Sequence, residues 1–209
     1  MQIYSVLRGE NTSPILYYKG DQLLRMGYPF YLPSREERYV AYPALVVRIG
    51  KLGKEVQPRY AHRYIDALGV GWDLQQPEKL ARLRLNGFPW QEAVAFAESS
   101  SATLSSSNAA VSGLSPFYTI SYTCDGVPYK DPLIISEEEI REGIATFSAC
   151  RLIKQGDLLF FLGKPIALLG DPHSSVSLQI GCDLHAFLYL SVGIEQGFSA
   201  FAEDLLRIR

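Results

Sequence analysis

Carboxylates are the main side chains of this 209-residue chain that could do chemistry, because it holds 22 Asp and Glu but only three His. Asp73 stands out among them. It ends the run Gly69-Val-Gly-Trp-Asp, whose two glycines would let the backbone turn sharply beside a large aromatic. Glu137, Glu138 and Glu139 are instead typical of the first turn of a helix, where the macrodipole favours negative charge. From the residues alone, a structural place in a turn is favoured for Asp73, and any catalysis would have to use carboxylates, Lys or Tyr.

Composition and charge exclude several classes of protein. The formal net charge of −2 gives no electrostatic basis for binding nucleic acid. Three cysteines at wide spacings form neither a disulfide framework nor a CxxC motif. The N-terminus lacks the pattern of a signal peptide, and no run approaches the roughly 20 apolar residues that span a bilayer. We therefore expect a cytoplasmic protein with no nucleic-acid and no membrane partner.

The pattern of the remaining residues predicts more strands than helices. Runs of β-branched and aromatic residues predict strands at 2–7, 15–19, 45–49, 117–124, 158–162, 178–180 and 186–192. Helices are predicted over 58–68 and 90–98, and a third after the capping box of Ser136 and Glu139, to about Ala149. The serine-rich run 99–113 is expected to be a mobile loop, and 198–209 fits a helix or a strand. Strands that do not alternate with helices favour a mixed β architecture over a doubly wound sheet.

Several of these segments resemble the fumarylacetoacetate hydrolase (FAH) family. The run PALVVRIGKLGKEVQPRYAHRYIDALGVGWD at 43–73 is similar to a family strand with two acids, E-x-E-L-x-V-V-I-G-K-x-G-K, followed by a helix and a Gly-x-D segment. GFPWQEAVAFA at 87–97 looks like G-L-P-W-x-x-A-K-A-F-D, and the end of 133–165 looks like L-x-x-G-D-L-I-F-T-G-T-P. ILYYK at 15–19 resembles the family's F-x-K-P strand. The resemblance covers most of the chain.

This resemblance implies a fold and a chemistry. The fold would be α+β and mainly β: a mixed β-roll, or flattened barrel, with a few short helices. We expect one such domain over 1–209, with a shortened N-terminal segment at 1–40 that lacks the family's His-x-x-Glu. Enzymes of the family, often homodimers, hold Mg²⁺ or Mn²⁺ on three carboxylates and cleave, decarboxylate or isomerise 2-oxo and β-diketo acids. The cation polarises the oxo-acid and stabilises the developing enolate.

The functional positions of the family nevertheless fall on other side chains in this sequence. The acids of E-x-E fall on Tyr42 and Ala44, so that only Asp73 keeps its carboxylate, as a remnant metal ligand. The Arg and Asp of T-A-R-D, the Lys and Asp of K-A-F-D and the two Thr of T-G-T-P fall on Pro77, Glu78, Val94, Ala97, Leu162 and Lys164. One carboxylate with water ligands will not retain Mg²⁺, so no cofactor is expected.

Three hypotheses follow for the function. The leading one is a catalytically degenerate family member, kept as a dimeric binding or interaction protein that could still take a small oxo-acid. The alternative is an active hydrolase or lyase with a relocated, metal-free site built from Asp73, Glu78, Lys164 and Tyr42, in which the lysine charge replaces the cation. The third is a partner subunit that supports an active paralogue in a heterodimer.

Overall fold

A computed structural model describes residues 1–8, 14–25, 28–33, 37–105 and 114–168, together with the backbone of two strands at 176–182 and 187–193. The described chain is a mixed α+β structure, rich in strands and poor in helices, and its sheets do not close into a barrel. The predicted fold class, a flattened roll with a few short helices, is confirmed.

The larger sheet carries the segments that resemble the family's metal-binding strands. Its strands run in the order β2-β1-β10-β4-β5-β6, and β11 pairs with the free part of β4. Their bounds are β1 Ile3–Leu7, β2 Ile15–Gly20, β4 Tyr39–Ile49, β5 Ile65–Gln75, β6 Ser100–Leu104, β10 Leu158–Leu162 and β11 Ile166–Leu168. β1 and β10 are parallel, whereas the other pairs in this sheet are antiparallel.

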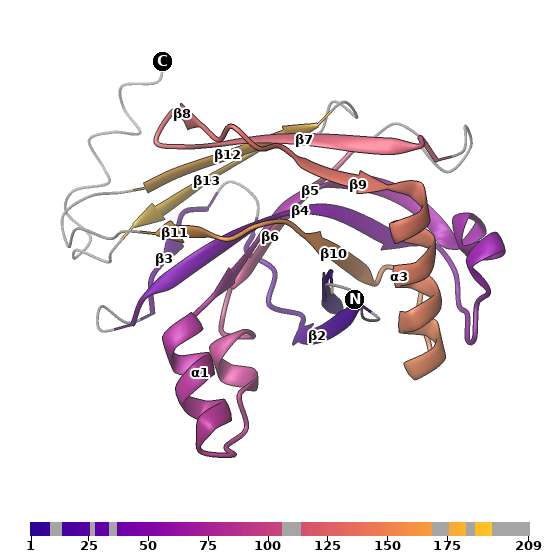
Figure 1. Ribbon diagram of the computed structural model, residues 1–209, viewed down its shortest axis with the longest axis horizontal. Helices are drawn as coiled ribbons and strands as arrows, with labels where there is room; N and C mark the ends of the chain where they lie inside the picture. Colours follow the sequence, from indigo (N-terminus) through magenta and orange to yellow (C-terminus); the bar gives the residue numbers. More distant parts are fainter. Residues whose placement is uncertain are drawn as a thin grey trace.

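The smaller sheet lies over one face of the larger one (Figure 1). Its order is β3-β13-β12-β7-β8, and β9 also pairs with β7. The bounds are β3 Phe30–Tyr31, β7 Phe117–Cys124, β8 Val127–Pro128, β9 Leu133–Ser136, β12 Val176–Cys182 and β13 Phe187–Gly193. As the Asp125-Gly126 pair predicts, β7 and β8 form a hairpin, and both turn residues have positive φ.

Alternation along the strands gives the larger sheet two different faces. Leu45 and Val47 of β4 and Trp72 of β5 point into the main core, where they meet Ile120 and Tyr122 of β7. The other face carries a smaller apolar cluster: Ile3, Ala44, Val46, Leu158, Phe160 and Leu162. The family-like functional positions of β4 and β10 therefore lie on the face turned away from the smaller sheet.

Helices are short and lie at the margins of the sheets. They are η1 Pro58–Tyr64 and η2 Gln91–Ala93, both 3-10 helices, and the α-helices α1 Pro77–Leu85 and α3 Glu137–Cys150. α3 begins at the predicted capping box, in which Ser136 and Glu139 satisfy each other's backbone N–H groups. In the described part of the chain, no helix is long and apolar enough to cross a membrane.

Three predicted elements are wrong in type or extent. The helix expected over 58–68 stops at Tyr64, because the chain then enters β5, and the helix expected over 90–98 is a single 3-10 turn. The loop expected over 99–113 begins as a strand, since residues 100–104 form β6 beside β5; positions 106–113 lie outside the described residues, as do 198–209. The helix α1 had no predicted counterpart.

The glycines before Asp73 do not form the expected turn but lie inside β5. A Cβ on Gly69 would lie 2.0 Å from the Thr103 carbonyl oxygen, and a Cβ on Gly71 would lie 2.4 Å from that of Ser101. Both glycines are therefore needed for the close approach of β6 to β5, not for a change of direction.

Candidate functional site

Strand register brings the family-like positions together on one face. Tyr42 of β4 lies opposite Asp73 of β5, and Ala44 lies opposite both Gly71 of β5 and Leu162 of β10. Directly opposed residues project to the same side of a sheet. Tyr42, Ala44 and Asp73, which resemble the positions of one family site, therefore lie close together on the same face. Of the three, only Asp73 carries a charge.

The Asp73 carboxylate is fully buried and already has partners on both oxygens. Lys19 of β2 donates to Oδ1 at 2.7 Å, and Gln75 donates to the same oxygen at 3.2 Å. The Ser5 hydroxyl of β1 donates to Oδ2. The carboxylate is thus a structural acceptor that joins three strands, and no part of it faces solvent.

Lys19 is equally buried and supplies the opposite charge. Its ammonium donates to three acceptors, because Nζ also lies 3.1 Å from the carbonyl oxygens of Leu74 and Ser99. Burial lowers the pKa of Lys19, and the charge and hydrogen bond of Asp73 oppose that shift. All three protons of the ammonium are therefore hydrogen-bonded within the protein, and none is left for a ligand.

These residues do not fit a Mg²⁺ or Mn²⁺ centre. Such ions take several oxygen ligands with carboxylates supplying the charge, whereas Tyr42 and Ala44 leave Asp73 alone and Lys19 neutralises it. Across the described residues, no group of three or more His, Cys, Asp or Glu side chains is placed to hold a metal ion. The donor set around Asp73 is that of a buried ion pair.

The other candidate residues lie apart from Asp73. Glu78 is exposed on α1 and forms an ion pair with Arg38, at 3.4 Å. Val94 is buried, and Ala97 is exposed. Lys164 is exposed after β10, in a groove that does not reach Asp73. Of the proposed cluster, Lys164 and Tyr42 line the second cavity of this groove, which neither Asp73 nor Glu78 lines.

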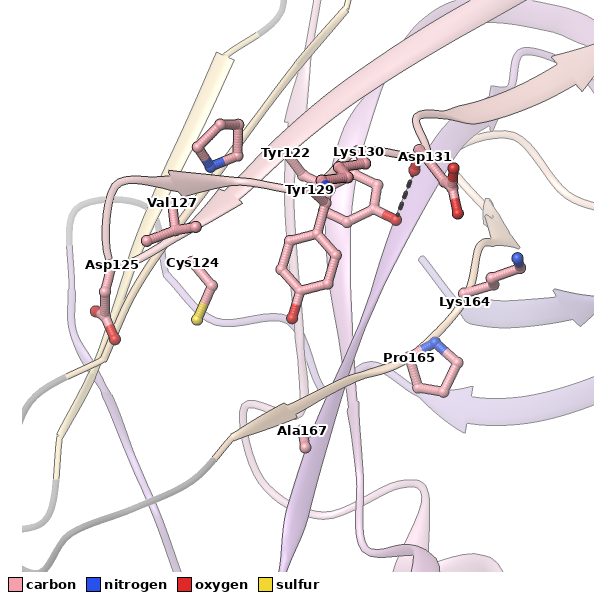
Figure 2. A pocket seen from close by; sticks show the side chains of 11 residues that line it. Tyr122, Cys124, Asp125, Val127, Tyr129, Lys130, Asp131, Lys164, Pro165 and Ala167 are labelled. Atoms are coloured by element: carbon pink, nitrogen blue, oxygen red, sulfur yellow. Dashed lines mark hydrogen bonds between the residues drawn. The ribbon is translucent and has the colours of Figure 1, made fainter.

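That groove consists of two adjoining cavities. The first, of about 680 Å³, lies between the β7–β8 hairpin and the segment 164–167 (Figure 2). The second, of about 610 Å³, reaches Tyr42, Arg8 and Leu162. Tyr122, Asp131, Lys164 and Pro165 line both. Burial, and then the charge of Asp73, raise the pKa of Tyr42, so that its phenol is neutral at pH 7.

The role of Lys19 and the aromatic lining of the groove were missed from the sequence. Lys19 shares the alternating face of β2 with the buried Tyr17, so the ILYYK pattern did carry the signal of an inward-facing lysine. Tyr122 and Tyr129 come together only through the β7–β8 hairpin, and nothing in their spacing marks them as a site.

The arrangement of the two sheets defines a class of fold, that of the FAH-type hydrolases and isomerases. A fumarylpyruvate hydrolase from Pseudomonas aeruginosa, solved with Mn²⁺ and pyruvate, superposes with a TM-score of 0.80 at 22% identity, over 93% of this chain and 90% of that one. A fumarylacetoacetate hydrolase family protein from Yersinia pestis CO92 gives 0.74 at 20% identity, over 93% and 92%. A 5-carboxymethyl-2-hydroxymuconate delta-isomerase from Mycobacterium smegmatis gives 0.76 at 14% identity, over 94% and 80%.

At these identities the likeness is one of fold. No protein-family model and no curated protein sequence matches the chain. Shared fold does not carry function by itself, because function depends on the side chains at the site. What this chain does must therefore be argued from Lys19, Asp73 and the groove.

Proposed function

We propose that this chain is a catalytically degenerate member of the FAH family that acts as a dimeric binding or interaction protein. Its fold is that of oxo-acid hydrolases and isomerases, which supports the family relation. The residues at the family's metal positions support the loss of its chemistry. The protein would keep the scaffold and the groove while lacking the charge that holds a divalent cation.

The state of Asp73 carries this proposal. A carboxylate that binds a metal needs a free lone pair beside a space that the cation can occupy, but Asp73 is fully buried and its oxygens already accept three hydrogen bonds. To reach it, a cation would have to displace the buried ammonium of Lys19, which has no path to water because its side chain is fully buried. Charge repulsion and the cost of burying a further charge both oppose that exchange.

Calorimetric titration of the full chain with Mn²⁺ and with Mg²⁺ tests the proposal. We expect no binding in the micromolar range. Micromolar binding that is lost in Asp73→Asn but kept in Glu78→Gln would refute it, since Glu78 is an exposed carboxylate on α1 that serves as the matched control.

A second candidate, a metal-free enzyme, is favoured by one observation. Lys164 and Tyr42 line the same cavity, where the lysine charge could stabilise an enolate. Turnover of oxaloacetate or an acylpyruvate that disappears in Lys164→Met and survives in Lys154→Met would favour it. Lys154 is an exposed lysine outside the groove. Absence of turnover across a broad panel of 2-oxo acids is the outcome that our leading proposal expects.

The dimer in this proposal is supported by the surface around α1. Leu85 is 88% exposed and Phe88 is 59% exposed, on a part of the molecule that projects from the sheets (Figure 1). Covering such side chains in a homodimer would remove apolar area from water. Light scattering should give twice the chain mass, and the double variant Leu85→Ser/Phe88→Ser should be a monomer; a heterodimer with an active paralogue would instead appear on co-purification from the native host.

A further inference from the structure

The first cavity of the groove has the size of a small-molecule site. It encloses about 680 Å³, within the range of roughly 300–1,000 Å³ that is typical of ligand pockets. The β7–β8 hairpin and the segment 129–131 form one side, and residues 164–167 form the other (Figure 2). Two segments far apart in sequence therefore enclose it.

One wall of this cavity is aromatic and held in place from behind. The rings of Tyr122 and Tyr129 lie 5.1 Å apart at 33°, and Trp72 packs edge-on against Tyr122 at 6.1 Å. The Tyr122 hydroxyl donates to the Asp131 carbonyl oxygen at 3.1 Å, so its ring is fixed at both ends. Tyr129 remains 44% exposed, which leaves ring surface open to a ligand.

Two of the four charged residues of the cavity, Lys164 and Asp131, lie at one end of it, whereas Asp125 lies at the other end beside Cys124, and Lys130 follows Tyr129. Burial raises the pKa of Tyr122, Tyr129 and Cys124, so these groups stay neutral at pH 7. In Figure 2, Lys164 and the Asp131 carboxylate lie on the same side, away from Cys124 and Val127. Both residues also line the second cavity, which places them where the two cavities join.

Lys164 and the Asp131 carboxylate have no ion-pair partner among the described residues, and they do not form a salt bridge with each other. A ligand with a carboxylate alone would pair with Lys164 but face repulsion from Asp131, and a ligand with an amine alone would meet the reverse. At this end of the cavity, a ligand that carries both charges can pair with both side chains.

We propose that this cavity binds a free α-amino acid with an apolar or aromatic side chain. Lys164 would pair with its carboxylate, Asp131 with its ammonium, and the side chain would lie against the Tyr122–Tyr129 wall. This inference deepens the proposed binding function, on which it rests, by naming a zwitterionic ligand. It distinguishes the groove from a site for an oxo-acid, because an oxo-acid lacks the ammonium.

Calorimetric titration of the full chain with four probes tests the proposal. L-phenylalanine and L-leucine are expected to bind with a Kd of about 1 mM or lower. Phenylpyruvate, which has the same ring and carboxylate but no ammonium, should bind roughly tenfold more weakly or worse, and so should phenethylamine, which has no carboxylate. Failure of both amino acids to bind, or equal binding of phenylpyruvate and L-phenylalanine, would overturn it.

Variants at the exposed ends of the cavity make the test specific. Lys164→Met should weaken L-phenylalanine roughly tenfold but not phenethylamine, which loses a repelling charge, and Asp131→Asn should weaken L-phenylalanine but not phenylpyruvate. Lys154→Met is the control and should bind as the parent does. Unchanged L-phenylalanine affinity in Lys164→Met would refute the assignment, and thermal unfolding will show that these exposed substitutions leave the fold intact.

The amino-acid site and the proposed function would be refuted by different measurements. Absence of amino-acid binding together with absence of Mn²⁺ binding would remove this ligand but leave a metal-free binding protein. Micromolar Mn²⁺ binding at Asp73 would refute the proposed function whatever binds in the groove, because neither Asp73 nor Lys19 lines the cavity.

Discussion

Replacing Lys19 by Met should destabilise the protein far more than the loss of an ordinary lysine. The substitution removes the only cation beside Asp73 within the described chain and leaves a carboxylate with no exposure to water. Breaking a buried ion pair from one side typically costs about 3–5 kcal/mol. The lost hydrogen bonds matter less, because the Ser99 carbonyl oxygen keeps the Leu74 N–H as a donor, at 2.8 Å.

For a chain of this length, each kcal/mol shifts Tm by about 2–4 °C, so Lys19→Met should lower Tm by roughly 6–20 °C. Urea unfolding followed by circular dichroism should report the matching loss of free energy, with an unchanged slope. Lys54→Met is the matched control, because Lys54 pairs with Glu55 at 3.7 Å on the surface and should contribute less than about 1 kcal/mol. A loss below about 1 kcal/mol in Lys19→Met would refute the reasoning.

The double variant Lys19→Met/Asp73→Leu distinguishes a charge effect from a packing effect. If the cost arises from an unpaired buried charge, removing both charges should recover much of it, and the double variant should lose far less than the two single variants together. Additive losses would show instead that the side chains contribute through packing alone.

Asp73→Asn adds a pH dependence with a definite sign. Without the opposing charge of Asp73, burial lowers the pKa of Lys19 further below its usual value of 10.5. The unfolded chain then binds more protons than the folded one in the window below 10.5, so the free energy of unfolding should rise as pH increases through that window. A free energy of unfolding that stays flat or falls there, relative to Lys19→Met/Asp73→Leu, would contradict the burial of a charged lysine.

Three further predictions follow from particular contacts. Gly71→Ala should cost about 1–3 kcal/mol or more in urea unfolding, because a Cβ would meet the Ser101 carbonyl oxygen at 2.4 Å. Gly126→Asn meets no neighbour but keeps a φ of +75°, which Asn tolerates better than most residues, so it should cost less than about 1 kcal/mol. The pKa of Tyr42 is raised in the folded state, so the stability that its neutral phenol contributes is lost as pH rises through that pKa. In Tyr42→Phe the free energy of unfolding should therefore fall less steeply above pH 10. An absorbance titration of the tyrosines that is unchanged by the substitution would contradict this. Ser136→Ala should cost about 1 kcal/mol by removing the cap of α3, measured by thermal unfolding.

The elements that were predicted correctly are those whose structure depends on interactions between residues close together in sequence. The apolar run of β10 and the capping box of α3 each act within a few residues, and both were correctly placed. The helix prediction over 58–68 was wrong at its end because residues 65–68 begin β5, which pairs with β4. Such long-range strand pairing overrides helical periodicity. Residues 100–104, at the start of the serine-rich run, form β6 for the same reason, since they pair with the edge of β5.

The side chains at the family-like positions could be predicted from the sequence, but their hydrogen-bond partners could not. Comparison of motifs placed Tyr42 and Ala44 at positions where acids are expected, and register confirms that both lie on the Asp73 face. That comparison treats each position separately, so it could not show that Lys19, from another strand, bonds to Asp73. The hydroxyl of Ser5 and the amide of Gln75 are equally remote in sequence pattern, because only the assembled sheet brings them within hydrogen-bond reach.

Charge balance explains why one lysine is enough to neutralise the site around Asp73. Three carboxylates beside one lysine would leave two negative charges, which a divalent cation neutralises. With Tyr42 and Ala44 in place of two acids, the single negative charge of Asp73 is matched by the single positive charge of Lys19. A divalent cation added to this pair would bring two uncompensated charges into a buried site, whereas the pair alone is neutral and fully hydrogen-bonded. Restoring a carboxylate at Tyr42 alone should therefore not restore a metal centre while Lys19 is present.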